Sequence, residues 1–148
     1  MPYVSATVLE VLRKSSLIPL GVPHSALTDV DFHGFTIPKG AIIIANLYDV
    51  HYDKAIWGDP EVFCPERFLT SDGKGMDKQH SIIAPFGIGR RQCLGETLAR
   101  NNIFLFLASL FQTFNIKEPV GAPVVKESTG FFRFPPEFKV VFEERQGN

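Results

Sequence analysis

The hydrophobic positions at the start of the chain follow a helical period. Four apolar side chains recur at spacings of four and three: Val4, Val8, Val11 and Leu12. This spacing places them on one face of a helix, predicted over Met1 to Lys14. The same helix carries Glu10 and Arg13, three positions apart and therefore on one side. By itself that spacing indicates an ordinary surface ion pair.

The middle of the chain changes from alternating to irregular. Asp31 to Ile37 roughly alternates, 38–40 reads Pro-Lys-Gly, and Ala41 to Ala45 is rich in β-branched residues, which predicts a hairpin of two strands around that turn. Asn46 to Tyr52 is expected to form a short helix. The sequence from there to Pro85 is long and mostly irregular, and such stretches are often functional.

The last third predicts a helix followed by strands. Gly95 to Thr113 lacks proline and internal glycine and carries Glu96 near its start. Its second half is apolar on every side, which predicts burial. After Phe114 the sequence becomes strand-like, with a turn around Gly130 and a closing strand from Phe138 to Phe142. The fold class predicted is α+β, mainly α with small β-hairpins, in one domain over 1–148.

Composition excludes several classes of protein. The chain has 148 residues and a net charge of −1, from 15 basic and 16 acidic side chains, so it lacks the basic surface of a nucleic-acid-binding protein. Two cysteines do not make a disulfide framework. No signal peptide pattern is visible, and no apolar run approaches the ~20 residues of a transmembrane helix.

The strongest candidate for chemistry is the glycine-rich segment from Phe86 to Gly95. It places Cys93 where a loop turns into a helix, whose N-terminus favours an anion, and a thiolate is the form of cysteine that binds metals. Taken alone, a cysteine there is structural about as often as functional. A dinucleotide-binding reading fails because position 92 is glutamine, not glycine. Cys64 is expected to be a small core residue.

The histidines add no metal site by spacing. They are scattered along the chain, at His24, His33, His51 and His80. Without the spacing of zinc ligands, each one alone is expected to be structural or exposed.

Five residues of the glycine-rich segment match a family pattern, Phe-x-x-Gly-x-Arg-x-Cys-x-Gly: Phe86, Gly89, Arg91, Cys93 and Gly95. The segment resembles the haem-binding loop of the cytochrome P450 superfamily, the haem-thiolate monooxygenases. Further stretches resemble that family's motifs in the same order, namely Glu10 to Arg13, Pro65 to Phe68 and Gly95 to Arg100. Others, such as Val22-Pro23-His24 and Ile37-Pro38-Lys39-Gly40, look like the microsomal clan that includes animal drug- and steroid-hydroxylating members.

The resemblance implies a set of cofactor-binding residues for haem b, iron protoporphyrin IX. Cys93 would be the axial ligand of the haem iron. Arg91 and His24 would bind the haem propionates, and Phe86 would pack beside the ligand. Gly89 and Gly95 would permit a tight loop and close approach to the porphyrin.

The resemblance also implies a structural triad and part of a substrate pocket. Glu10, Arg13 and Arg67 would form a buried charge triad that fixes the proximal side of the haem, so a surface ion pair becomes the weaker reading. The substrate-contacting stretches would include four apolar residues: Leu20, Val22, Phe131 and Phe132.

The resemblance covers only the C-terminal, haem-loop part of a cytochrome P450 domain. The N-terminal part, with the membrane anchor and the oxygen-activating helix, is expected to be absent, so the chain alone is predicted to be inactive and unable to hold haem stably. The parent protein implied is a monooxygenase on the cytoplasmic face of the endoplasmic reticulum membrane. It would insert one oxygen atom of O2 into an apolar substrate, with electrons from NADPH through a flavoprotein reductase. The alternative is a short, non-catalytic haem-binding or interaction module.

Overall fold

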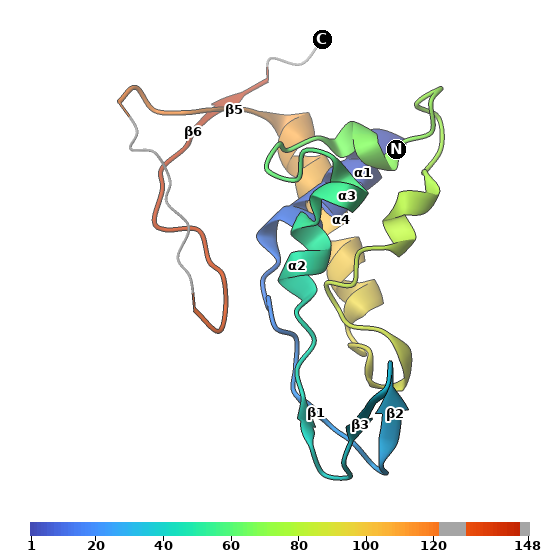
Figure 1. Ribbon diagram of the computed structural model, residues 1–148. Coiled ribbons are helices and arrows are strands. Elements are labelled where there is room, and N and C mark those ends of the chain that lie inside the picture. The colour runs from blue at the N-terminus through green and yellow to red at the C-terminus, as the bar shows by residue number, and fades with distance from the viewer. Residues whose placement is uncertain (122–129, 146–148) are drawn as a thin grey trace.

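The computed structural model describes residues 1–121 and 130–145 of the chain. Figure 1 shows the helices in the middle of the molecule, with β1, β2 and β3 at one end and β5 and β6 at the other. The predicted mixed architecture, mainly helical with small antiparallel strand pairs, is confirmed. The elements are α1 (Pro2–Ser15), β1 (His24–Ser25), β2 (Val30–Phe32), β3 (Phe35–Ile37), β4 (Ile42–Ile43), α2 (Leu47–Tyr52), α3 (Lys54–Trp57), the 3-10 helices η1 (Pro65–Phe68), η2 (Lys78–Ser81) and η3 (Gly89–Arg91), α4 (Glu96–Thr113), β5 (Phe114–Lys117) and β6 (Val141–Glu144).

Helix α1 forms as predicted, and part of its predicted apolar face is buried. Val8 of that face is buried and Val11 is exposed, while Ala6 and Leu9 beside it also face the core. The buried side also carries Glu10 and Arg13, both fully enclosed. The orientation of α1 is therefore set by polar partners as well as by apolar spacing, and those partners lie far away in the sequence.

The hydrophobic core lies where α1 meets the irregular stretch that follows α2. Its members are Ala6, Leu9, Trp57, Phe68 and Ile83. The rings of Trp57 and Phe68 are 5.7 Å apart, and Trp57 Nε1 donates to the Val50 carbonyl at 2.7 Å. Burying a side chain the size of Phe68 contributes about 1.5–3 kcal/mol.

Short helices order the chain on either side of that core. The helix predicted over Asn46 to Tyr52 is confirmed as α2, and the Asn46 side chain accepts from the Asp49 amide at 3.3 Å as its N-cap. Asp53 caps α3 in the same way, by accepting from the Ala55 amide at 2.7 Å. The rest of the stretch is irregular, as predicted, apart from η1 and η2.

The predicted hairpin is wrong in its pairing. β2 pairs with β3 across His33 and Gly34, both of which have positive φ, 51° and 83°. Positive φ at both turn positions closes a tight two-residue hairpin, so the segment predicted as one strand turns back on itself. The later strand, β4, pairs with β1 instead, which places His24 opposite Ile43.

Helix α4 has the predicted extent, but its predicted burial is wrong. None of its residues is buried, and the side chains of Leu105 and Phe106 are 61% and 67% exposed. The physical reason is that α1 packs along α4 while no other described helix covers its remaining sides. A large apolar helix surface is thus left open to solvent.

The chain ends in an antiparallel pair of strands, β5 with β6, in which Phe114 lies opposite Glu144. The closing strand was predicted over Phe138 to Phe142 and begins later, at Val141. The predicted turn around Gly130 lies partly outside the described residues. Among the described residues, no helix combines the length and apolarity that crossing a membrane requires.

Candidate functional site

The loop that carries Cys93 is closed by backbone hydrogen bonds. The Cys93 amide donates to the Phe86 carbonyl at 2.9 Å, and the Gly87 amide donates to the Ala84 carbonyl at 3.0 Å. Gly87 and Gly89 have φ of +75° and +74°, a region that side-chain-bearing residues avoid. The loop therefore requires glycine at both positions. Gly87 was not among the candidate residues, although it directly follows the turn at 85–86, a position that favours glycine.

The backbone conformation at Gly95 does not require glycine. Its φ is −88°, which any residue adopts, and an added Cβ would meet only Cys93 Sγ, at 3.8 Å. The tightness of the loop therefore does not require glycine at this position. Close approach to a porphyrin is the remaining explanation, and it stays a prediction.

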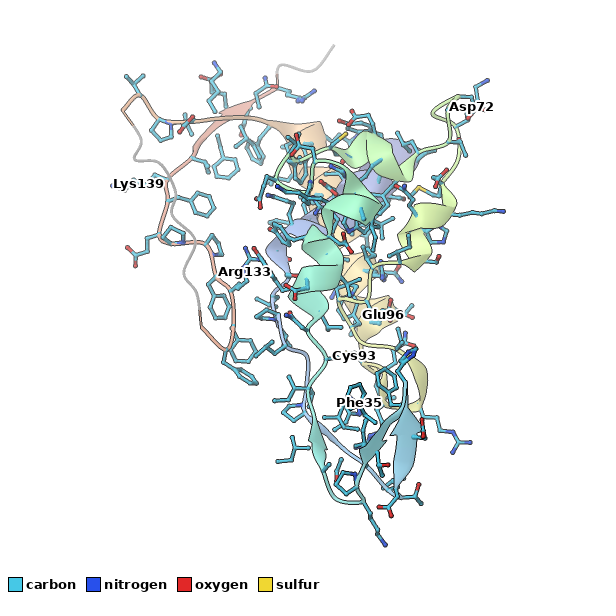
Figure 2. All side chains as sticks on the ribbon, in the orientation of Figure 1. Phe35, Asp72, Cys93, Glu96, Arg133 and Lys139 are labelled. Atoms are coloured by element: carbon cyan, nitrogen blue, oxygen red, sulfur yellow. The ribbon has the colours of Figure 1, made fainter. Side chains whose placement is uncertain are left out.

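Cys93 is exposed at the Glu96 end of α4 (Figure 2). No side chain caps the helix there, so its first amides and the positive end of its dipole favour an anion nearby. The Glu96 carboxylate pairs with Arg100 at 2.7 Å and also accepts from the Gln92 side chain. The loop thus presents an exposed thiol beside the N-terminal end of α4.

The surroundings of Cys93 fit a flat apolar group with an attached metal. Neighbouring apolar side chains are strongly exposed, at 79% for Ile88 and 105% for Leu94. Within the described ranges, no group of three or more His, Cys, Asp or Glu side chains is arranged to hold a metal ion. A single thiolate is a suitable ligand for iron that already carries four porphyrin nitrogens, so the donor set fits haem.

The other predicted haem-binding residues lie on separate elements. Arg91 belongs to η3 and His24 to β1, and both side chains are exposed. Among the described residues, neither side chain has a hydrogen-bond or ion-pair partner, although the His24 backbone lies in the β1–β4 pair. The two polar side chains are therefore accessible, but the structure does not bring them into contact with each other. Phe86 is half-buried beneath Arg100, whose Cζ lies 5.3 Å from the ring centroid.

The three charged residues predicted as a triad are brought together. Glu10 Oε2 accepts from Arg13 Nε and Glu10 Oε1 from Arg13 Nη2, both at 2.8 Å, and both side chains are fully buried. Arg67 Nε lies 3.4 Å from Glu10 Oε2, an ion pair without hydrogen-bond geometry. Paired charges of this kind tolerate burial, whereas a single one would not.

The remaining polar atoms of this charge cluster bind the irregular stretch. Arg13 donates to the carbonyls of His51 at 2.7 Å and Pro60 at 2.8 Å, and Arg67 donates to the Trp57 carbonyl at 2.8 Å. The Cys64 amide donates to Glu10 Oε1 at 2.9 Å. The cluster therefore holds a segment with little regular structure against α1.

Cys64 itself is not the core residue that was predicted. It is partly exposed, and its thiol donates to Glu66 Oε2 at 3.5 Å. Of its two apolar neighbours, Pro65 is buried but Phe63 is 49% exposed.

His51, which was expected to be structural or exposed, is a buried structural residue whose contacts could not be predicted from the sequence. Its ring is 1% exposed and bonds at both nitrogens, to Ser16 Oγ at 2.6 Å and to the Ala84 amide at 3.2 Å. Burial, and secondly the positive Arg13, lower the pKa of His51 from 6.5 to about 4. The one sequence signal is its spacing of four from Leu47, which places both on the inner face of α2.

The predicted pocket residues are apolar and accessible. All four are exposed or half-exposed: Leu20, Val22, Phe131 and Phe132. The two segments that carry them lie side by side, because the Arg133 amide donates to the Leu17 carbonyl at 2.9 Å. Arg133 is buried against Tyr48 of α2, with its Cζ 4.7 Å from the ring centroid (Figure 2).

Together, the glycine loop, the exposed thiol and its apolar rim form the candidate site of this protein. Comparison with known proteins identifies the family. A model of the family "Cytochrome P450" matches residues 1–142, and the chain belongs to that family.

The relatives it matches are much longer than this chain. It is similar to Cytochrome P450 2U1 of Mus musculus, with 44% identity over 98% of this chain and 27% of the relative. It is also similar to Farnesoate epoxidase of Bombyx mori, at 40% identity over 99% and 29%, and to Steroid 17-alpha-hydroxylase/17,20 lyase of Ictalurus punctatus, at 41% over 99% and 29%. The chain therefore spans between a quarter and a third of the length of these relatives.

Proposed function

We propose that these residues form the thiolate side of a haem-dependent monooxygenase. The observation that carries the proposal is the exposed Cys93 thiol on a glycine loop at the uncapped start of α4, in a chain of the cytochrome P450 family. When bound there, haem b would activate O2 for insertion of one oxygen atom into a substrate C–H bond. Cys93 would hold the iron as a thiolate, and the loop amides and helix dipole would stabilise that charge.

The other residues have binding and shielding roles in this proposal. The guanidinium of Arg91 and the ring of His24 would bind the two propionates, since both are exposed and have polar groups available. Phe86 would keep water from the sulfur, held in place by Arg100. The charge cluster of Glu10, Arg13 and Arg67 would fix the loop's support and take no part in proton transfer.

We further propose that residues 1–148 work as the C-terminal part of a single longer domain. The support is the share of the relatives' length that the chain spans, and the open apolar surface of α4. In that setting the preceding part would provide the distal face of the haem site and an anchor in the endoplasmic reticulum membrane. A flavoprotein reductase on the cytoplasmic side would deliver electrons from NADPH.

The substrate is proposed to be an apolar organic molecule. Phe131 and Phe132 are exposed and pack edge to face, with ring centroids 5.0 Å apart. Two of the relatives named above are described as acting on farnesoate and on a steroid, which are both largely apolar.

The test is a balanced turnover measurement on the protein made from the complete transcript. With the reductase, NADPH, 18O-labelled O2 and a panel of apolar substrates, we expect RH + O2 + NADPH + H+ to give ROH + H2O + NADP+, with one labelled oxygen in the product. An in-frame stop before Met1, or a complete protein that binds no haem, would contradict the proposal and favour a short haem-binding or interaction module. The 148-residue chain alone is expected to give no product under the same conditions.

A further inference from the structure

His51 joins three separate parts of the chain. It lies in α2, and its ring reaches Ser16, at the end of α1, and the amide of Ala84, which precedes the Cys93 loop. These contacts span 35 and 33 positions of sequence. Its backbone carbonyl also accepts from Arg13 of the charge cluster, at 2.7 Å.

The hydrogen bonds fix the protonation state of the ring. A backbone amide can only donate, so the Nε2 atom that faces Ala84 has to be unprotonated. The ring proton is then on Nδ1, where it is donated to Ser16 Oγ at 2.6 Å. This neutral ring uses both of its nitrogens, and the lowered pKa of His51 agrees with that state.

A short series of backbone bonds leads from His51 to the thiol. Ala84, whose amide bonds to the His51 ring, accepts a hydrogen bond at its carbonyl from the Gly87 amide at 3.0 Å. Gly87 then begins the turn, and Phe86 accepts from the Cys93 amide at 2.9 Å. The beginning of the loop is thus fixed by His51, while its end is fixed by α4.

We propose that His51 is the positioning residue that couples the buried charge cluster to the Cys93 loop. It fixes Ala84 relative to Arg13, and thereby sets where the sulfur lies. This inference rests on the proposed haem-thiolate function for its effect on the cofactor, but the placement of the loop can be tested without haem.

The first experiment measures hydrogen exchange in four variants of the chain. His51→Phe keeps a ring of similar size and removes both hydrogen bonds, and Ser16→Ala removes only the bond at Nδ1. His51→Gln keeps an acceptor within reach of Ala84, and His80→Phe is the matched control, because His80 is exposed on η2. We expect exchange of the Ala84 and Cys93 amides to rise roughly five- to a hundredfold in His51→Phe, with partial recovery in His51→Gln and no change in His80→Phe.

The second experiment measures the haem-thiolate absorption of the reduced carbon monoxide complex in the complete protein. His51→Phe should lower the fraction of haem with that absorption severalfold, Ser16→Ala should lower it less, and His51→Gln should recover part of it. Equal fractions in wild type and His51→Phe, with unchanged exchange at Ala84, would overturn the inference.

The two readouts separate the possible failures. A wild type without thiolate-type absorption contradicts the proposed function, while the exchange measurement still decides the role of His51. If His51→Phe does not fold, Ser16→Ala and His51→Gln decide. Faster exchange confined to the amides of Ala84 and the loop supports the inference, and loosening spread evenly over the core contradicts it.

Discussion

Replacing Glu10 by glutamine tests whether the charge cluster holds the fold together. Glu10 accepts three hydrogen bonds, two from Arg13 and one from the Cys64 amide, and forms an ion pair with Arg67. In Glu10→Gln the side chain keeps its shape, but an NH2 donor replaces one carboxylate oxygen. At the Oε2 position this donor would face Arg13 Nε and Arg67 Nε, and at the Oε1 position it would face the Cys64 amide. Arg13, which is fully buried, and Arg67, which is largely buried, are then left without a counter-charge.

The expected cost is large relative to the stability of a small domain. Removing one partner of a buried ion pair costs about 3–5 kcal/mol, and total stabilities are about 5–15 kcal/mol. The assay is urea unfolding followed by fluorescence of Trp57, the single tryptophan of the chain, which is buried beside both arginines. We expect a large downward shift of the midpoint or no cooperative transition at all.

The matched control is Glu61→Gln. Glu61 pairs with Lys14 at 3.6 Å, and its side chain is 71% exposed, so this change should alter the free energy of unfolding by less than about 0.5 kcal/mol. If Glu10→Gln were also within about 1 kcal/mol of wild type, the cluster would not be the support described here.

Three further predictions follow from other parts of the structure. The pKa of His51 is about 4 in the folded protein, whereas that of the unfolded ring is about 6.5. The unfolded state therefore takes up the proton first as the pH falls, so the free energy of unfolding should decrease between pH 6.5 and pH 4, by about 3 kcal/mol in total. His51→Phe should remove that part of the pH dependence, and an equally steep profile in urea titrations would contradict the assignment. Gly87→Ala and Gly89→Ala should each lower the free energy of unfolding in urea by about 1–2 kcal/mol, because both positions have positive φ. Gly95→Ala should leave it nearly unchanged, and equal losses at all three positions would refute this reasoning. Arg133→Lys keeps the charge but loses the guanidinium that lies over the Tyr48 ring, so limited proteolysis should cut near Phe131 faster than in wild type. An unchanged rate of cleavage would argue against an anchoring role for Arg133.

Local patterns predicted the features that depend on neighbouring residues. Helices α2 and α4 could be predicted because their signals are local: Asn46 caps α2 from the position before it, and α4 contains neither proline nor glycine. The loop around Cys93 could be predicted for the same reason, since its glycines and cysteine are close in sequence. The pairing of β2 with β3 was missed because His33, which adopts positive φ there, does not indicate a turn as strongly as asparagine or glycine would.

Features that depend on contacts between residues far apart in the sequence could not be predicted from local patterns. His51 appeared to be an isolated histidine, since Ser16 and Ala84 become its partners only in the folded chain. The apolar sides of α4 predicted burial, but hydrophobicity indicates only that a side chain prefers to be covered, not whether the described residues cover it. The apolar spacing of α1 predicted the burial of Val8 but not that of Glu10 and Arg13, whose partners lie far away in the sequence.

The central claim is that Cys93 is the thiolate ligand of haem iron. The direct measurement is the absorption spectrum of the reduced carbon monoxide complex of the complete protein, compared between Cys93→Ala and Cys64→Ala. Loss of the haem-thiolate absorption in Cys93→Ala, together with its retention in Cys64→Ala, is the predicted result. A thiolate-type spectrum that persists in Cys93→Ala would contradict the account.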